Sequence, residues 1–407
     1  MTKLLIIGAG DFQLPLVKAG ARNFEILLAA PVVPDAFIPY VKKILIADVR
    51  DKEKILEFAK QENIAGVITD QTDIAVRTVA YVAEKLNLPG IGYNTSCLFT
   101  DKSLMRSKLE DLGIKLLPNK TVCSIEEAIE YYNEIKGEII IKPLDTQGSR
   151  GVQACSNINE LIKKYHDTEK WSSNKKVIVE RKANGREFVV EGLAFNYDFE
   201  NLICGDSFPF SIEDSFSAKS RIFPSTVDKV ICDRILDLNK KIIKGFGLKQ
   251  GITHSEFIMN DDEIYLIETA ARGGGVFISS DIVSITTGLN TEEFLVNIST
   301  GHQKSLPKIK YNGCYCGYIA FYIPNGEVVK VKGKEYVLSL PFVHSNQLDK
   351  LYEGLVVNNE TFNKTSRLAI VVSAKSKTEF DENVKNIKDN LNVVVNTKDG
   401  VSSLIWE

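Results

Sequence analysis

One stretch of the chain decides its fold: residues 251–275 read GITHSEFIMNDDEIYLIETAARGGG. An alternating first half and an apolar second half flank the polar turn NDDE, and this pattern predicts a β-hairpin. Pairing symmetric about Asp262 sets Glu256 opposite Glu268, with Cβ atoms about 5 Å apart. Carboxylates that face each other repel, so the pair indicates a divalent cation held by hard oxygen ligands. The alternative is the solvated face of an ordinary hairpin.

The composition is that of a globular protein with more than one domain. The 407 residues predict roughly two to four domains, and their 44% hydrophobic and 25% charged content is ordinary. A net charge of −3 gives no electrostatic case for a nucleic-acid or membrane partner. The N-terminal apolar run is too short for a signal peptide, and no run approaches the ~18 residues that span a bilayer. Seven scattered cysteines and four separated histidines favour a reduced, cytoplasmic protein without a His/Cys zinc site.

Strands and helices alternate over residues 1–98, which predicts a parallel, doubly wound sheet. The first strand leads into a tight turn at Gly8 to Gly10 that opens a helix. A dinucleotide fingerprint would need a third glycine where Gln13 stands, and an acidic residue where the second strand ends at Ala30. We therefore interpret this part as a Rossmann-like support domain rather than a nicotinamide site.

Two lysines and a glycine-bearing loop suggest a phosphate site. Lys102 lies in the first turn of a predicted helix that Thr100 or Asp101 caps. Lys142 ends a strand and is followed by the loop DTQGSRG at 145–151. Backbone N–H groups and the hydroxyl of such a loop donate to phosphate, while the lysine supplies charge. The alternatives are a solvated helix lysine and a plain hairpin loop.

Acidic residues follow on the next two predicted strands. Glu180 ends one strand, and Glu187 and Glu191 lie four apart on the next, so they share one face. Acids beside an apolar slot can hold ribose hydroxyls and an adenine amino group. The Ser-rich residues 208–224 are expected to form a mobile loop. Residues 305–407, with a βαβ unit near their end, carry no motif that indicates chemistry.

These features occur in an order and at a spacing that resemble the ATP-grasp superfamily. The residues that carry the resemblance are Lys102, Lys142 with its loop, Glu180, Glu187, Glu256, Glu268 and Arg272. Within the superfamily, the chain looks most like the group of carbamoyl-phosphate-synthase large subunits and amino-acid ligases. The resemblance covers most of the chain and is weakest after residue 305.

The resemblance implies a fold of mixed α/β and α+β class. A Rossmann-like domain at 1–98 would precede a two-subdomain ATP-grasp domain at 99–304, divided near residue 176. Residues 305–407 would form a small α+β domain. ATP would bind between the two subdomains, and two copies of the chain would form a homodimer.

The resemblance also implies a role for each matched residue. The implied ATP contacts are Lys102 and Lys142 with the phosphates, Gly148, Ser149 and Gly151 in a phosphate lid, Glu180 and the backbone of Ala183 with adenine, and Glu187 with ribose. Glu256 and Glu268 would hold Mg²⁺, for which Mn²⁺ can substitute. Arg272 and Lys142 would act in catalysis, Arg272 by binding the substrate carboxylate or its acyl phosphate. Ala270 stands where the family commonly has an asparagine, which leaves the third metal ligand open.

These roles imply an ATP-dependent carboxylate–amine ligase. Such an enzyme phosphorylates a small acid to an acyl phosphate and then joins it to an amine, with release of phosphate. Two other functions remain open. One is bicarbonate activation of the carboxylase or carbamoyl-phosphate kind, and the other is non-catalytic nucleotide binding, if Ala270 abolishes metal binding. Specificity for the acid and amine would lie around residues 273–281 and 208–224.

Overall fold

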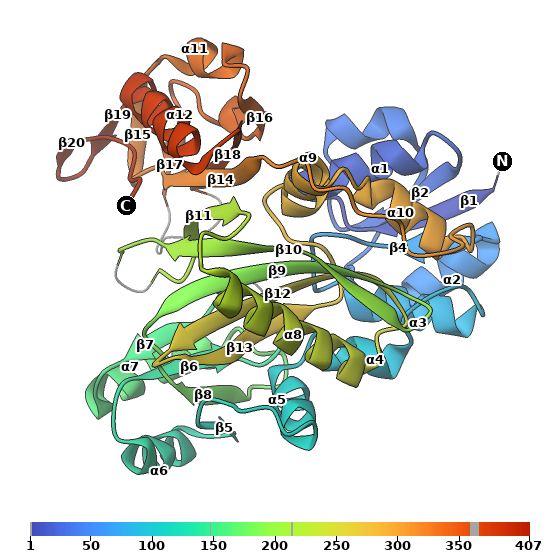
Figure 1. The fold of residues 1–407 in the computed structure, drawn as a ribbon, viewed down its shortest axis with the longest axis horizontal. Helices are drawn as coiled ribbons and strands as arrows, with labels where there is room; N and C mark the ends of the chain where they lie inside the picture. Colours follow the sequence, from blue (N-terminus) through green and yellow to red (C-terminus); the bar gives the residue numbers. More distant parts are fainter. Residues whose placement is uncertain (1, 147, 213–214, 359–365) are drawn as a thin grey trace.

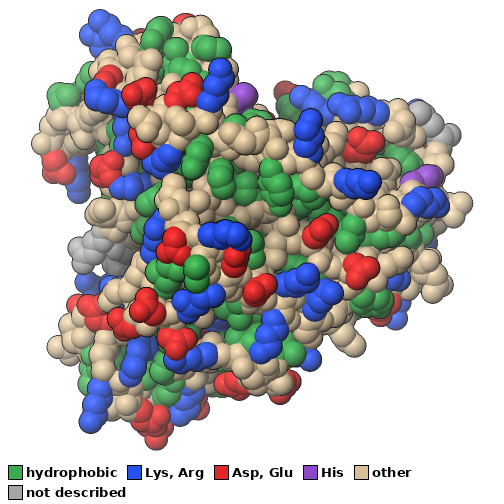
Figure 2. Space-filling model, in the orientation of Figure 1, with side chains coloured by type: hydrophobic (Ala, Val, Ile, Leu, Met, Phe, Trp, Pro, Cys, Tyr) green, Lys and Arg blue, Asp and Glu red, His purple; other side chains and the backbone are tan. Residues whose placement is uncertain are grey.

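The computed structural model describes residues 2–146, 148–212, 215–358 and 366–407, and it arranges them around four β-sheets. Figure 1 shows the largest sheet in the middle, the N-terminal domain and the C-terminal segment above it on opposite sides, and a smaller sheet below. Basic and acidic side chains are interspersed over the face shown in Figure 2. Within the described ranges, no helix is long and apolar enough to cross a membrane.

The N-terminal sheet is parallel, in the order β3-β2-β1-β4. Its elements are β1 (Lys3–Ile7), η1 (Asp11–Gln13), α1 (Leu14–Gly20), β2 (Glu25–Ala30), η2 (Asp35–Tyr40), β3 (Val41–Ile46), α2 (Lys52–Glu62), β4 (Gly66–Ile68), α3 (Val76–Lys85) and α4 (Tyr93–Leu98). Leu5 and Ile7 face a core with α2 and α3, whereas Leu4 and Ile6 face a core that α1 and α10 (Thr291–Ser299) complete. Burial on both faces is typical of parallel strands, and the predicted doubly wound sheet is confirmed.

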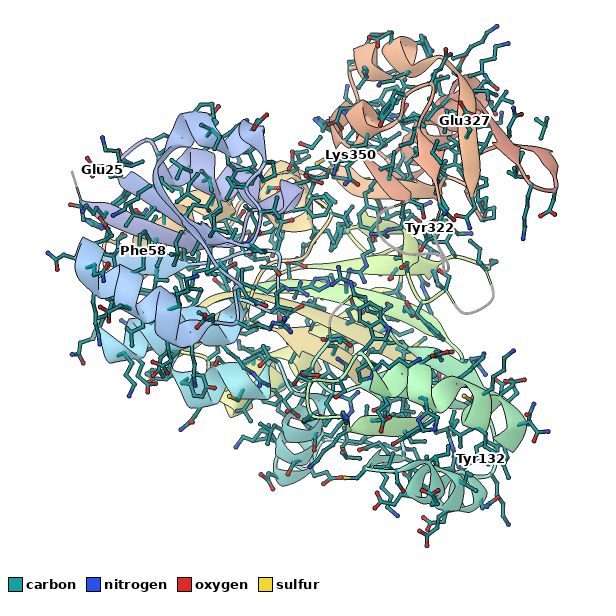
Figure 3. The ribbon with its side chains drawn as sticks, turned by 180° about the vertical axis from the view of Figure 1, so that it is seen from behind. Glu25, Phe58, Tyr132, Tyr322, Glu327 and Lys350 are labelled. Atoms are coloured by element: carbon teal, nitrogen blue, oxygen red, sulfur yellow. The ribbon has the colours of Figure 1, made fainter. Side chains whose placement is uncertain are left out.

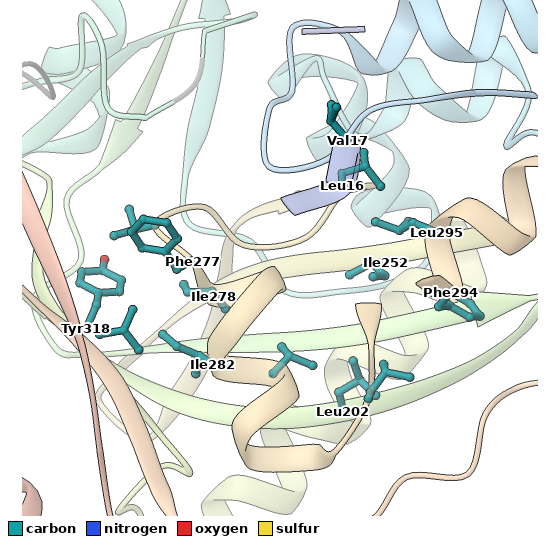
Figure 4. Close-up of a cluster of buried hydrophobic side chains, with 14 of the residues drawn as sticks. Leu16, Val17, Leu202, Ile252, Phe277, Ile278, Ile282, Phe294, Leu295 and Tyr318 are labelled. Carbon is teal, nitrogen blue, oxygen red and sulfur yellow. The ribbon is translucent and has the colours of Figure 1, made fainter. Parts of the chain in front are cut away.

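The largest buried cluster joins this domain to the central sheet. Figure 4 shows Leu16 and Val17 of α1 near Leu295 of α10 and Ile252 of the central sheet. Because apolar burial stabilises roughly in proportion to area, a core shared in this way fixes the N-terminal domain against the sheet that carries the candidate site.

A separate antiparallel sheet follows, in the order β5-β8-β6-β7. Its elements are α5 (Lys102–Asp111), β5 (Asn119–Val122), α6 (Ile125–Ile135), β6 (Ile139–Pro143), β7 (Gln153–Cys155), α7 (Ile158–Glu169) and β8 (Val177–Arg181). The side chain of Asp101 accepts two N–H groups at the start of α5, so the predicted cap is confirmed. Ile141 and Val179 pack in the core beneath α6 and α7. Because side chains alternate along a strand, the neighbouring Lys142 and Glu180 face the opposite way.

The central sheet has eight strands in the order β13-β12-β9-β10-β11-β14-β18-β16. Its elements are β9 (Arg186–Phe195), β10 (Asp198–Pro209), β11 (Ala218–Phe223), α8 (Lys229–Phe246), β12 (Gln250–Asn260), β13 (Glu263–Ala270), η3 (Ile278–Ile282), α9 (Val283–Thr287), β14 (Tyr315–Tyr322), β16 (Val343–Asn346) and β18 (Arg367–Ala374). Strands β14, β16 and β18 come from the segment predicted as a separate C-terminal domain, and β11 pairs directly with β14. The sheet therefore crosses the predicted boundary at residue 305.

The last segment adds a small sheet in the order β17-β15-β19-β20. Its elements are β15 (Gly326–Lys332), α11 (Lys334–Ser339), η4 (Leu348–Lys350), β17 (Val356–Val357), α12 (Lys377–Asn390), β19 (Asn392–Thr397) and β20 (Gly400–Ser402). Figure 3, a view from behind, shows Tyr322 where this segment meets the central sheet and Lys350 on the side toward the N-terminal domain. Lys350 forms an ion pair with Asp11, so segments from both ends of the chain touch.

The hairpin of β12 and β13 contains the predicted carboxylate pair, but its turn and its strand register differ from the prediction. The strands are joined by the two-residue turn Asp261-Asp262, in which both residues have positive φ, as a type I′ turn requires. This turn moves the register by one residue from the expected symmetry about Asp262. A β-bulge at Ile267 moves it back, so that Glu256 faces Glu268.

The loop expected over residues 208–224 is shorter than predicted, because residues 208–209 and 218–223 are strand. Strand β10 runs to Pro209, and β11 begins at Ala218. Serine, lysine and arginine gave the stretch a loop-like composition, but Ile222 packs in the C-terminal core and Phe223 packs in the core shared with the N-terminal domain. Residues 213–214 lie outside the described residues.

Candidate active site

A cavity lies where the central sheet, the N-terminal domain and the loop after β6 meet. The residues singled out in the sequence that line it are Gly148, Ser149, Glu256, Glu268 and Arg272. The other predicted ATP contacts do not line this cavity; they are Lys102, Lys142, Gly151, Glu180, Ala183 and Glu187. The predicted site thus divides into a cavity between β12, β13 and the loop, and a set of predicted ATP contacts outside that cavity.

Glu180 is the centre of a buried ion-pair network. Its carboxylate accepts hydrogen bonds from Arg106 Nε at 2.7 Å and from Lys142 Nζ, and its side chain is only 2% exposed. Burial alone would raise the pKa of Glu180, but the two cations outweigh burial and lower it to about 2. In this structure Lys142 and Glu180 therefore bind each other, and their predicted contacts with phosphate and adenine stay predictions.

Sequence reasoning missed Arg106, although a signal was present. Arg106 lies four residues after Lys102 on α5, and residues four apart share one face of a helix. Besides Glu180, Arg106 reaches across to the hairpin, where its guanidinium donates to the carbonyl oxygen of Ile267 at 2.7 Å. The bulge residue of β13 is thus held by the same arginine that neutralises Glu180.

Lys102 connects the loop after β6 to the hairpin. Its Nζ donates to the carbonyl oxygen of Thr146 at 2.8 Å and lies 3.8 Å from the carboxylate of Glu268. The side chain is buried, so this ammonium is not the solvated helix lysine of the alternative interpretation. Lys102 stands between the predicted phosphate lid and a predicted metal ligand.

The facing carboxylates are each balanced by a cation of the chain. Glu256 accepts a hydrogen bond from Arg221 on β11, and Glu268 has Lys102 nearby. Burial opposes ionisation of Glu256, but Arg221 and His254 hold its pKa well below its usual range. The repulsion inferred from the sequence is thus offset by side chains of the protein itself.

The donor set at the hairpin fits Mg²⁺ bound together with a nucleotide. Among the described residues, no group of three or more His, Cys, Asp or Glu side chains has metal-binding geometry. Mg²⁺ usually takes one or two carboxylates and completes its shell with water and substrate phosphate oxygens. Glu256 and Glu268 both line the cavity and supply those two carboxylates. Ala270 is buried and adds no side-chain oxygen.

A second buried network joins β9 to β12. His254 hydrogen-bonds through Nδ1 to Glu191, which also accepts the backbone N–H of Gly274 at 3.1 Å. Arg221 lies 2.8 Å from the other ring nitrogen of His254. Burial would lower the pKa of His254, but the charge of Glu191 raises it. Glu191 therefore positions His254, while Glu187 on the same strand accepts a hydrogen bond from Ser207 at 3.4 Å.

Arg272 already has a carboxylate partner within the chain. Its guanidinium makes two hydrogen bonds of 2.8 Å to Asp73, and it also donates to the carbonyl oxygen of Gly273. The predicted contact of Arg272 with a substrate carboxylate stays a prediction, because in this structure the acid that it binds is Asp73. No sequence signal pointed to Asp73, which lies 199 residues away.

The predicted phosphate lid contacts the segment before β11. Ser149 Oγ donates to the carbonyl oxygen of Phe216 at 3.1 Å. Gly148, Ser149 and Gly151 all have positive φ, a backbone conformation that favours glycine. Ala183 follows β8 in the connection to β9 and is half-buried. Gln147, the remaining residue of the loop's centre, lies outside the described residues.

The sequence also resembles those of known proteins. Residues 135–281 match the family model of the ATP-grasp domain. The alanine–anticapsin ligase of Bacillus subtilis is 26% identical over 293 residues, which cover 66% of this chain and 62% of that protein. The carbamoyl phosphate synthase large chain of Clostridium perfringens is 23% identical over 410 residues, which cover 85% of this chain and 37% of that protein. The chain thus spans less than two thirds of the length of these relatives.

A solved structure extends the likeness to the whole fold. The L-amino acid ligase from Bacillus licheniformis superposes with a TM-score of 0.81 at 20% sequence identity, covering 98% of this chain and 99% of that one. At this identity the likeness shows the fold. Together with the match over residues 135–281, it shows that the chain has the ATP-grasp fold.

Proposed function

We propose that the chain is an ATP-dependent ligase that joins a small carboxylic acid to an amine through an acyl phosphate and releases ADP. The observation that carries the proposal is the cross-strand pair Glu256 and Glu268, which lines a cavity together with the loop at Gly148 and Ser149 and with Arg272. The names of the alanine–anticapsin ligase and the L-amino acid ligase support the same reaction class.

Phosphoryl transfer needs charge neutralisation and alignment more than covalent help from the protein. Glu256 and Glu268 would hold Mg²⁺, which would offset the charge of the transferring phosphate. Lys102, buried beside Glu268, adds a fixed positive charge at the same end of the cavity. When the nucleotide binds, Lys142 would release the carboxylate of Glu180 and bind a nucleotide phosphate instead.

Arg272 would orient the acid. Its planar guanidinium makes two hydrogen bonds to the carboxylate of Asp73. A substrate carboxylate would accept the same two hydrogen bonds in place of Asp73. The carboxylate oxygen attacks the terminal phosphorus of ATP, ADP leaves, and an acyl phosphate forms. The amine then attacks the acyl carbon and phosphate leaves. Ser149, which donates to the backbone of Phe216, would help to close the lid over this end and exclude water that would hydrolyse the acyl phosphate.

Bicarbonate activation is the second candidate. The alignment with a carbamoyl phosphate synthase large chain covers 85% of this chain and supports that alternative. Homodimerisation and domain boundaries near residues 98, 176 and 304 belong to the main proposal.

A phosphate-release assay separates these functions. Acids, amines and bicarbonate are supplied with Mg-ATP, singly and in pairs. We expect the wild type to release phosphate only when an acid and an amine are both present. The Glu268→Gln variant should release none. The matched control is Glu263→Gln, an exposed residue at the other end of β13. Release with bicarbonate alone would favour the second candidate. Nucleotide binding without turnover, equal in wild type and Glu268→Gln and independent of metal, would refute both.

A further inference from the structure

The C-terminal segment contributes to the wall of the cavity. Tyr318 on β14 and Arg367 on β18 line it together with Arg221, Arg272 and Glu256. Arg367 is the first residue of β18, and its guanidinium lies 5.9 Å from the ring of Tyr318. A segment without any recognisable motif thus places a cation against the candidate site.

The arginines of this cavity wall differ in how their charge is balanced. Arg221 is paired with Glu256, and Arg272 is paired with Asp73. Arg367 is 7% exposed and donates to the carbonyl oxygen of Ala218 at 2.7 Å, but its Nε has no hydrogen-bond partner. Among the described residues, no carboxylate forms an ion pair with it. Within the part of the chain that the structure describes, Arg367 is therefore a buried cation without a carboxylate partner.

Such a charge needs an explanation, because a buried ion without a counter-ion is unfavourable and buried charges are normally paired. The hydrogen bond to Ala218 does not explain the charge, because a neutral donor could make the same hydrogen bond. A guanidinium matches the geometry of a carboxylate, and an anion that enters the cavity would pair with its positive charge.

We propose that Arg367 binds a carboxylate of an organic substrate, other than the carboxylate that is phosphorylated. This inference rests on the proposed ligase function and adds the class of substrate: either the acid carries two carboxylates, or the amine is an amino acid whose carboxylate stays free. Arg367 would fix that substrate from the C-terminal segment, in the cavity that the hairpin carboxylates also line.

Isothermal titration in the presence of MgADP distinguishes whether the carboxylate belongs to the acid or to the amine. Glutarate is the probe for a dicarboxylic acid, and glycine is the probe for an amino acid. In Arg367→Met we expect the Kd of one probe to rise about 10- to 100-fold, the worth of a charge-assisted hydrogen bond. Arg367→Lys should recover part of the loss. Arg234→Met is the matched control, because Arg234 is exposed on α8, outside the cavity, and hydrogen-bonds to the carbonyl oxygen of Asp262.

A structural role would give a different result. Arg367→Met breaks no ion pair, so the Tm of the ligand-free protein should stay within a few degrees of the wild type. A large fall in Tm with unchanged Kd values would overturn the proposal. So would an equal loss of MgADP affinity, which would assign Arg367 to the nucleotide, or a wild type that binds neither probe. If the phosphate-release screen fails while a probe still depends on Arg367, the ligase reaction is wrong and the carboxylate site stands.

Discussion

Replacing Glu180 by glutamine tests the buried ion-pair network most directly. The change keeps the shape of the side chain but removes the one negative charge that Arg106 and Lys142 share. Two buried cations are then left facing each other without compensation. Breaking a buried ion pair by removal of one partner typically costs about 3–5 kcal/mol.

The pKa of Glu180 gives a second estimate of the same quantity. Lowering from an ordinary value of 4.5 to about 2 corresponds to about 3 kcal/mol of stabilisation at neutral pH. The sign follows from the depressed value: the contribution is fully present above pH 4.5 and is lost as the pH falls through about 2. The difference between wild type and Glu180→Gln should therefore shrink in acid.

Native-state hydrogen exchange of the β6 and β8 amides is the suitable assay, because it reports the local free energy of opening in a chain with several sheets. We expect the variant to lose about 3 kcal/mol at neutral pH. The matched control is Glu138→Gln, which changes partly exposed contacts with Lys182 and Ser156 beside the ends of β6 and β8 and should leave these amides unchanged. A loss below about 1 kcal/mol, or one that persists undiminished in acid, would refute the reasoning.

Two further predictions concern other parts of the chain. Burial raises the pKa of Glu292 to about 8, so the stability of the wild type should fall as the pH rises from 4.5 through that value. Glu292→Gln removes this loss of stability. At about pH 9 the variant should therefore have a higher Tm than the wild type, equivalent to about 1–3 kcal/mol, whereas at about pH 4 it should have no advantage. Equal Tm values of the two proteins at both pH values would contradict the prediction. Gly151 has a φ of +71°, and an added Cβ would lie 2.6 Å from the ring of Trp171. Gly151→Ala should therefore lower stability by about 1–3 kcal/mol and shift the tryptophan emission; an unaltered spectrum and Tm would show that the loop adapts freely.

Local patterns predicted most of the fold. The apolar strands of the N-terminal domain, and the cap of α5 at Asp101, depend on neighbours in the sequence and are confirmed. The hairpin shows the limit of this reasoning. Glu256 does face Glu268, but through a tighter turn and a compensating bulge, and no periodicity in the sequence distinguishes these two routes to the same pair.

The candidate site was less accessible to sequence reasoning because its charges are balanced by distant residues. Asp73 on Arg272 and Arg221 on Glu256 come from elements whose proximity only the folded sheet order establishes. Arg106 is the exception, since its position one helical turn after Lys102 was visible in the sequence. Arg367 had no local signal of any kind.

The continuity of the central sheet past residue 305 determines where the molecule can bend. Rotating the last segment against the rest would break the hydrogen bonds between β11 and β14, whereas the sheet of β5 to β8 shares no strand pairing with the central sheet. We therefore expect any bending to occur between these two sheets, at the connections near residues 99 and 181. Arg106, which donates to the carbonyl oxygen of Ile267, and Lys102, which lies beside Glu268, join α5 to the hairpin, and separating the two sheets there would break both contacts.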